Sequence, residues 1–414
     1  MNTNKTTPLE GARVLDLTTF WAGPQPTAIL ADLGAEVIKL EAIQRLDPFR
    51  AYGAPSNPTP ERPYEWSPLF NSVNRNKRGI TLNLASDEGR DLFKQLVAKS
   101  NAVVDNYSPR VLTQFGLQYE VLREINPAIV LTSISGFGQS GPWRDYVSFA
   151  AIGEALSGIS SLTGYTNEGV LLHGVGVSDP YTGLTAAFAT LSALYVAGET
   201  GRGQHIDVSQ LESSIPFLAD AFMDFSLNHR RRERRTNDDP ARAPHGCFPA
   251  QGDDAWIAIS VGTETEWQSL LEMMGRPRWA GAETFATPLN RYRNREALNG
   301  LVAEWTKSQD KERLARELQA RGVAAAPVRS PSEQLTDPQL QATGFFQYVE
   351  RKYTGRQPYP SFPVRFDGAY PRIHRAGPPL GEDNHYVFTE ILGLDDTELA
   401  RLREAGVIGD QPIR

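Results

Sequence analysis

One acidic residue, Asp179, stands among glycines and apolar residues in the segment GVGVSDPYTG, residues 174–183. Because Asp followed by Pro is a frequent helix start, Asp179 and Pro180 are predicted to be the N-cap and the first residue of a helix. The same carboxylate could also do chemistry. With an ordinary pKa of ~3.9 it is ionised at neutral pH and can act as a nucleophile without a general base. The local sequence leaves both roles open.

A second candidate is the glycine-rich segment GFGQSG, Gly136–Gly141, which matches the spacing GxGxxG after an expected strand. The segment PWRD, residues 142–145, follows in place of a helix start, and Ser161 stands where an acidic residue would bind a ribose. These residues argue against an NAD or FAD site. The favoured interpretation is a loop at the carboxyl end of a strand, where a ligand can approach the backbone.

Other reactive side chains form no established motif. The six histidines are scattered without HxxxH or Cys–His spacing, so no metal site is expected, and neither GxSxG nor Walker A occurs. Cys247 follows His245 by two residues, and a structural thiol is favoured over a nucleophile. The arginine-rich run 230–235 is interpreted as a solvated linker, with a phosphate contact as the less favoured alternative.

The composition is that of a globular protein. The chain has 414 residues, 40% of them hydrophobic and 22% charged, and a formal net charge of −7, which argues against nucleic-acid and membrane binding. The single cysteine excludes an internal disulfide, and no signal peptide or membrane-spanning segment is recognised, so a cytoplasmic location is expected. The length predicts two or three domains.

Strands and helices alternate along the first half. Residues 13–18 and 35–41 are predicted strands on either side of a helix at 24–34, and such a unit implies a parallel sheet. A nearly apolar helix from Pro180 is predicted to be buried. Further strands are expected at 79–84, 101–107, 127–135 and 205–209, with a helix at 88–99 capped by Ser86.

A second α/β unit is predicted after the charged segment 229–244. Its expected strands are 256–261 and 322–328, and its expected helices are 263–275 and 294–308. A last helix is expected at 397–406.

Several longer segments occur in one order from end to end of the chain and resemble the class III CoA-transferases of the CaiB/BaiF type, which include formyl-CoA and carnitine enzymes. They are LEGARVLDLT, LADLGAEVIKLE, NRNKRGITLNL, NPAIVLTSISGFGQSGP, DPYTG with TGRGQHIDVS, APHGCFPAQGDDAWIAISV, GVAAAPV and GPPLGEDN.

The resemblance implies an α/β fold in which both chain ends build a large Rossmann-like domain around a smaller inserted α/β domain, and two chains interlock as a homodimer. The implied boundaries are 1–228 for the first part of the large domain, 229–244 for a linker, 245–328 for the small domain and 329–414 for the return.

The resemblance also assigns the chemistry. Asp179 takes the place of the family's nucleophile, which moves CoA from an acyl-CoA donor to a free carboxylic acid through an aspartyl-CoA thioester. CoA is then a substrate, and no tightly bound cofactor is expected. The residues implied to contact CoA are Trp21, Ala22, Asn74, Arg75, Asn76, Lys77, Asn106, Tyr107, Ser108 and Arg110, and those of the substrate pocket are Phe20, Gly138, Gln139, Phe149 and Ala150.

The sequence departs from the family at several of these places. Ala42 and Gln114 stand where the formyl-CoA enzyme has arginines, and Arg75 or Arg110 could replace them. Phe149 and Ala150 stand where the related racemases carry a catalytic histidine.

A racemase that exchanges α-protons is therefore a second hypothesis, but the site lacks one of the two bases that this reaction requires. A non-catalytic acyl-CoA-binding protein is a third hypothesis. The aromatic residues at the site, including Phe20, Trp21 and Phe149, predict an acyl group with hydrophobic bulk rather than formate or oxalate.

Overall fold

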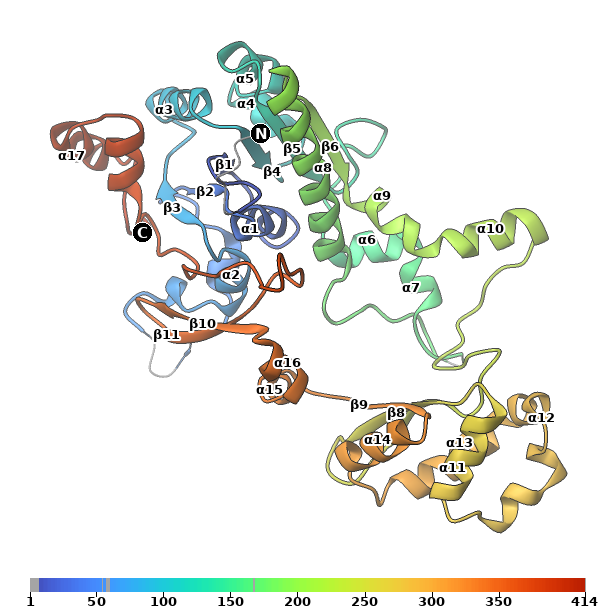
Figure 1. Ribbon diagram of the computed structural model, residues 1–414. Helices are drawn as coiled ribbons and strands as arrows, with labels where there is room; N and C mark the ends of the chain where they lie inside the picture. Colours follow the sequence, from blue (N-terminus) through green and yellow to red (C-terminus); the bar gives the residue numbers. More distant parts are fainter. Residues whose placement is uncertain (1–6, 54, 57–59, 167, 414) are drawn as a thin grey trace. The chain divides into compact units, whose positions relative to one another are not determined.

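The computed structural model describes residues 7–53, 55–56, 60–166 and 168–413 (Figure 1). The chain forms two compact units. The large unit comprises Met1–Ser160, Leu172–Arg231 and Thr343–Arg414, and the small unit comprises Ser161–Leu171 and Arg232–Ala342. Both ends of the chain therefore belong to the large unit.

A six-stranded parallel sheet forms the centre of the large unit, in the order β3-β2-β1-β4-β5-β6. The chain reverses its direction of progress between β1 and β4, and open α/β sheets bind ligands at such a point, outside the carboxyl ends of the strands. The prediction of an α/β fold with a parallel sheet is confirmed. The strands are β1 (Arg13–Asp16), β2 (Glu36–Glu41), β3 (Arg78–Thr81), β4 (Ala102–Asp105), β5 (Val130–Ser135) and β6 (His205–Ser209).

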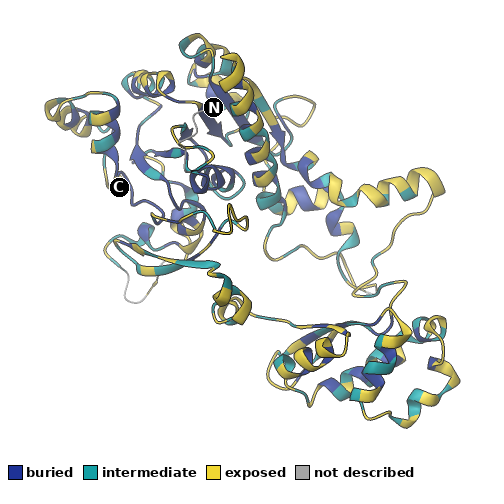
Figure 2. Ribbon diagram, viewed as in Figure 1, coloured by how far each residue is buried: buried dark blue, intermediate teal, exposed yellow. Residues whose placement is uncertain are grey.

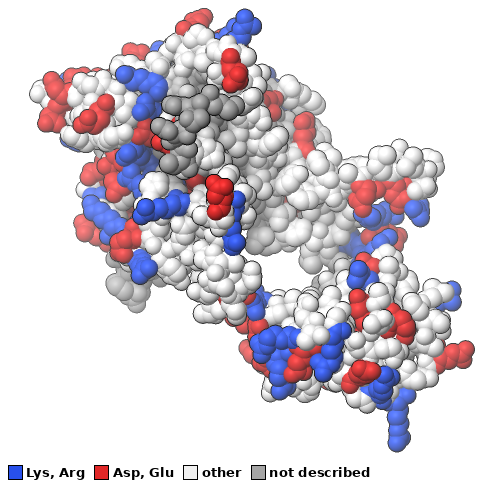
Figure 3. Space-filling model, viewed as in Figure 1, with Lys and Arg blue, Asp and Glu red and all other residues white. Residues whose placement is uncertain are grey.

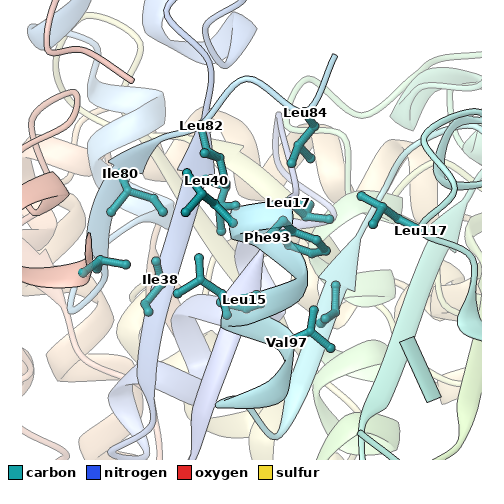
Figure 4. Close-up of a cluster of buried hydrophobic side chains, with 14 of the residues drawn as sticks. Leu15, Leu17, Ile38, Leu40, Ile80, Leu82, Leu84, Phe93, Val97 and Leu117 are labelled. Atoms are coloured by element: carbon teal, nitrogen blue, oxygen red, sulfur yellow. The ribbon is translucent and has the colours of Figure 1, made fainter. Parts of the chain in front are cut away.

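Helices cover both faces of this sheet, which explains why its strands are apolar on both sides. On one face Leu15 and Ile38 pack against Phe93 and Val97 of α3 (Asp87–Ala98), as Figure 4 shows. On the other face, strand residues such as Val14 pack against α1 (Pro24–Asp32) and α8 (Ser178–Thr200). The cap predicted at Ser86 is confirmed, because its hydroxyl accepts from the backbone N–H of Gly89.

Shorter helices connect these elements. In the large unit they are η1 (Pro48–Ala51), η2 (Pro63–Glu65), α2 (Pro68–Val73), α4 (Arg110–Gln114), α5 (Tyr119–Ile125), α6 (Ala150–Ser157), α9 (Gln210–Ser214), η3 (Ile215–Leu218) and α10 (Ala219–Asn228), while α7 (Ile159–Leu162) crosses into the small unit. No helix in the described ranges combines the length and the apolar character that crossing a membrane requires.

The prediction that the helix from Pro180 is buried is only half correct. One face of α8 packs on the sheet through small residues such as Ala186 and Ala193. The opposite face is exposed and carries Leu184, Phe188 and Tyr195. In Figure 2 much of α8 and nearly all of α10 have the colour of exposed residues. The apolar composition of this segment does not indicate which surface covers the second face of the helix.

The C-terminal part of the large unit returns to the edge strand β3. The side chain of Asp383 accepts from Gly79 N at 2.8 Å, and that of Asn384 accepts from Thr81 N at 2.8 Å. The returning elements are β10 (Phe346–Arg351), antiparallel to β11 (Gly355–Pro360), then the π-helix η6 (Tyr386–Ile391) and α17 (Asp396–Glu404). The predicted last helix is thus confirmed.

The small unit contains a three-stranded antiparallel sheet in the order β7-β8-β9 and its own apolar core around Trp267 and Leu298. Its elements are β7 (His245–Pro249), β8 (Trp256–Ser260), α11 (Glu264–Met273), η4 (Arg278–Gly281), η5 (Glu283–Phe285), α12 (Pro288–Arg293), α13 (Arg295–Thr306), α14 (Lys311–Ala320), β9 (Ala324–Pro327) and α15 (Pro331–Gln334). Helix α16 (Pro338–Thr343) ends at the boundary with the large unit.

Candidate active site

A cleft of about 610 Å³ opens at the carboxyl ends of the parallel strands in the large unit. Segments that follow β1, β2, β3, β4 and β5 line it, and Asp179 and Gln210 lie in its wall. The cleft therefore occupies the place that the strand order favours for a ligand.

Asp179 lies at the second position of α8 and not at its N-cap. The helix begins at Ser178 with Val177 as the N-cap residue, and the cap has no side-chain hydrogen bond. The cap prediction is wrong because the side chain turns away from the backbone: Gln210 Nε2 donates to Asp179 Oδ1 and, at 3.2 Å, to Ser178 Oγ. A carboxylate in the first turn still benefits from the positive end of the helix dipole.

The environment of Asp179 makes its carboxyl group more basic than usual. The pKa of Asp179 is raised to about 6: burial is the largest cause, the hydrogen bond from Gln210 lowers the pKa, and the negative charge of Glu154 raises it. A carboxyl group in a cleft with such a shifted pKa is a typical feature of a functional site.

Glu154 supports the segment that precedes α8. It is buried on α6, and its Oε2 accepts from the backbone N–H of His173 at 3.2 Å and lies 3.4 Å from His173 Nδ1. Its Oε1 is buried without a hydrogen-bond partner among the described residues. A buried acid next to Asp179 is a second source of negative charge at the site.

Aromatic rings line the cleft beside Asp179. The ring of Phe20 contacts those of Phe149 and Phe49 edge to face, with centroids 5.6 and 5.7 Å apart. Phe20 has a φ of 63°, an uncommon conformation for a bulky residue, and its N–H donates to Asp47 Oδ1 at 3.1 Å. The side chain of Asn106 exchanges two hydrogen bonds of 2.8 Å with the backbone of Thr19, which ties the loop after β1 to the end of β4.

Seven of the residues predicted for the site line this one cleft. Beside Asp179 they are Phe20, Ala22, Asn106, Tyr107, Ser108 and Phe149. Gln210 and Glu154 were not predicted, because the hydrogen bond of Gln210 and the electrostatic influence of Glu154 on Asp179 depend on the packing of α6 and α9 against the start of α8. The one available signal was that Gln210 directly follows a strand of the parallel sheet.

The NRNK motif lies outside the cleft lining, and its charges neutralise buried acids. Arg75 pairs with Asp32 at 2.6 Å, and Asn76 also donates to Asp32. Lys77 Nζ donates to Asp16 Oδ2, to Pro24 O and to Asn74 Oδ1, each at 2.9 Å. All four motif residues are buried, so these cations are not available to a phosphate in the cleft.

The remaining predicted residues also lie outside the cleft lining. The backbone N–H of Gln139 donates to Asp207, and Gly138 lines a separate hollow with that acid. Arg110 is exposed on α4. The carbonyl groups of Trp21 and Ala150 accept hydrogen bonds from Gln25 N and Ser178 Oγ, so their backbones support helix starts.

No three His, Cys, Asp or Glu side chains gather in the described part of the chain in a way that could hold a metal ion. The site therefore consists of a carboxylate, its amide partner and an aromatic wall in a cleft of about 610 Å³. Fold and site together define an α/β protein in which a carboxylate, a potential nucleophile, lies at a Rossmann-like ligand site.

Comparison with known proteins identifies the family. The family model "CoA-transferase family III" matches residues 9–384. The chain is 33% identical to succinyl-CoA–D-citramalate CoA-transferase of Chloroflexus aurantiacus, over 97% of this chain and 98% of that protein. It is 31% identical to formyl-CoA:oxalate CoA-transferase of Streptomyces coelicolor, over 97% and 99% of the two chains.

Among solved structures, a CaiB/BaiF family protein from Brucella suis is similar, with a TM-score of 0.85 and 32% identity over 94% of this chain and all of that one. The chain belongs to CoA-transferase family III and is a CoA-transferase. The resemblance of the sequence to this family is confirmed.

Two substitutions next to Asp179 are expected to move its pKa in opposite directions. Gln210→Leu removes a donor to the charged form and raises the pKa above about 6, whereas Glu154→Gln removes a like charge and lowers it. The measurement is a ¹³C titration of labelled Asp carboxyl groups, with the Asp179 signal assigned from Asp179→Asn. Glu199→Gln, exposed at the far end of α8, is the control. A shift of the same sign in both variants would contradict the assignment.

Proposed function

We propose that the protein transfers CoA from an acyl-CoA to a free carboxylic acid through a covalent thioester on Asp179. The observation that carries this proposal is the Asp179 carboxylate in the wall of the cleft, held by Gln210 through Oδ1. Its Oδ2 has no hydrogen bond to the described residues, and this oxygen is the one that attacks.

The first half of the reaction loads CoA onto the protein. Asp179 Oδ2 attacks the carbonyl carbon of the donor thioester, the C–S bond breaks, and a mixed anhydride and CoA thiolate result. The thiolate then attacks Asp179 Cγ and displaces the donor acid as a carboxylate. The product is an aspartyl-CoA thioester, so the energy of the original thioester is kept and no ATP is needed.

The second half repeats these steps with the acceptor. Its carboxylate attacks Asp179 Cγ and releases the thiolate, which then attacks the acceptor carbonyl of the new anhydride. CoA leaves on the acceptor acid, and the Asp179 carboxylate is regenerated. No net proton transfer is required, which suits a site whose reacting group is a carboxylate.

Gln210 supports both roles of Asp179. In the resting site its amide holds the carboxylate through Oδ1. When a nucleophile attacks Asp179 Cγ, negative charge develops on the same oxygen, and the amide is already positioned to donate to it. With a pKa of about 6, Asp179 is still mostly ionised at neutral pH and is more basic than an ordinary carboxylate.

Asp179→Ala is expected to lower acyl-CoA:acid exchange roughly 10³-fold or more, because the covalent route is lost. In the unaltered protein, incubation with acyl-CoA followed by hydroxylamine should modify Asp179, as detected by mass spectrometry of peptides. Glu199→Ala is the control for an exposed acid on the same helix.

Full exchange activity of Asp179→Ala would refute the proposal. Uptake of deuterium at the α-carbon of the acyl group in D₂O, without CoA exchange, would favour a racemase, and tight CoA binding without either reaction would favour a binding protein.

The acyl group that this site accepts is proposed to have hydrophobic bulk. The support is the aromatic wall: Phe20 and Phe149 line the cleft together with Asp179, and Ile134 adds an aliphatic side chain. Among the described residues, the groups that shift the pKa of Asp179 are Gln210 and Glu154, and neither is a cation that would pair with a second carboxylate of the substrate beside Asp179.

With a common acceptor, isovaleryl-CoA and phenylacetyl-CoA are expected to give higher kcat/KM than formyl-CoA and succinyl-CoA. Phe149→Ala should narrow this difference several-fold, because part of the apolar contact is removed. Tyr348→Ala, which changes an exposed ring on β10, should leave it unchanged. If formyl-CoA with oxalate were the best pair, the proposed acyl class would be wrong.

A homodimer, interlocked as the family resemblance implies, is proposed as the working form. The apolar side chains of α10 are exposed, including Phe222, Phe225 and Leu227, and no residue of this helix is buried. In Figure 3 the surface over α8 carries few charged side chains. Exposed apolar side chains gathered along one helix are typical of a protein–protein interface, and a second copy of the chain would cover them.

Light scattering is expected to give the mass of a dimer for the protein and of a monomer for Phe222→Glu, because a charge in an apolar interface is costly. Val364→Glu, at another exposed apolar residue, should remain dimeric. A monomeric unaltered protein, or dimers in both variants, would argue against this interface.

A further inference from the structure

Among the described residues that line the cleft, one carries a basic side chain. Arg45 follows β2, and a hydrogen bond of 3.0 Å from its N–H to Ala42 O closes the turn that presents it. The side chain is exposed, and its guanidinium has no ion pair or hydrogen bond with the described residues. A cation without a partner in a ligand cleft is available to an anionic ligand.

Neighbouring cations beneath the cleft are already neutralised. Lys39 lies 3.2 Å from Asp47, and Arg50 pairs with Glu41 at 2.8 Å and with Glu65 at 3.0 Å. These groups are buried and serve the fold. Within the described part of the chain, the positive charge that the cleft can offer to a ligand is therefore that of Arg45.

Arg45 and Asp179 act on different parts of the cleft. Burial and nearby acids raise the pKa of Tyr107, and Arg45 opposes this rise, so the guanidinium lies within electrostatic reach of the Tyr107 ring. The groups that shift the pKa of Asp179 do not include Arg45. A ligand that reaches both would place its reacting carbonyl at Asp179 and an anionic group near Tyr107.

The wall around this second part suits a nucleotide. Apolar side chains after β3 and on α4, Leu82, Leu84 and Val111, lie beside the polar Asn83 and Ser108. An aromatic base can pack on the former, while a phosphate needs a cation. A guanidinium matches phosphate oxygens with two parallel N–H donors.

From this arrangement we infer that Arg45 binds a phosphate group of the CoA nucleotide and sets the affinity of the cleft for the nucleotide end of its substrate. The inference rests on the proposed CoA transfer at this cleft. Arg45 is a binding residue in this role and takes no part in the exchange at Asp179.

The test compares the protein with Arg45→Gln on three donors that carry the same acyl group: acyl-CoA, acyl-dephospho-CoA and S-acyl-pantetheine. With acyl-CoA, Arg45→Gln should raise KM roughly tenfold and leave kcat unchanged, as expected for the loss of one charge-assisted contact. With acyl-pantetheine, which has no phosphate, the two proteins should be equal. Arg45→Lys should recover part of the loss because it restores the positive charge, and equal kinetics with acyl-pantetheine show that Arg45→Gln is folded.

The dephospho-CoA donor distinguishes the two phosphate sources. A loss that disappears with it assigns Arg45 to the 3′-phosphate, and a loss that persists assigns it to the diphosphate. Arg123→Gln, an exposed arginine of α5 outside the cleft lining, is the matched control and should behave as the unaltered protein.

Equal KM values of Arg45→Gln and the unaltered protein for acyl-CoA would overturn the inference. So would an equal loss with acyl-pantetheine, or a loss seen only when the acyl group carries a second carboxylate. Calorimetric binding of CoA itself tests the two proposals separately. If the unaltered protein shows no exchange activity but binds CoA more tightly than Arg45→Gln does, the binding role of Arg45 is supported and transfer through Asp179 is refuted.

Discussion

The buried pair of Asp16 and Lys77 is the interaction on which the cleft depends. Asp16 ends β1, and its two oxygens accept from Thr18, Thr27 and Lys77, so the turn after β1 leaves the sheet in one direction. That turn carries Phe20 into the cleft. Removing one member of such a pair leaves an uncompensated buried charge, which costs about 3–5 kcal/mol. The wall beside Asp179 is therefore positioned by charges that never meet the ligand.

Helix α8 connects this wall to Asp179, the proposed nucleophile. Its small residues lie close to the sheet and fix the helix start, where Gln210 and Glu154 set the basicity of Asp179 in opposite directions. The outer face of the same helix is apolar and exposed. One element thus positions the carboxylate, covers the sheet and carries exposed apolar side chains on its outer face, which the proposed homodimer would cover.

The sheet could be predicted because its strands are nearly continuous apolar segments between helices with clear caps, as at Ser86. Asp179 could be predicted from the family resemblance, but its amide partner could not, since Gln210 meets it only through packing. The prediction that the NRNK motif contacts CoA rested on the family resemblance and on its charges. Arg75 and Lys77 instead pair with acids at positions 32 and 16, and a sequence does not show which charges pair in the fold. Apolar content likewise did not distinguish the two faces of α8.

The edge strand β3 is completed by side chains from the end of the chain. Asp383 and Asn384 occupy its outward N–H groups, and the N–H of Asp383 donates back to Gly79 O at 2.9 Å. An edge without such partners invites pairing with a foreign strand. During synthesis the rest of the sheet leaves the ribosome long before these residues do. The small unit is thus translated while the sheet still has an open side, and the side chains that cover β3 become available only afterwards.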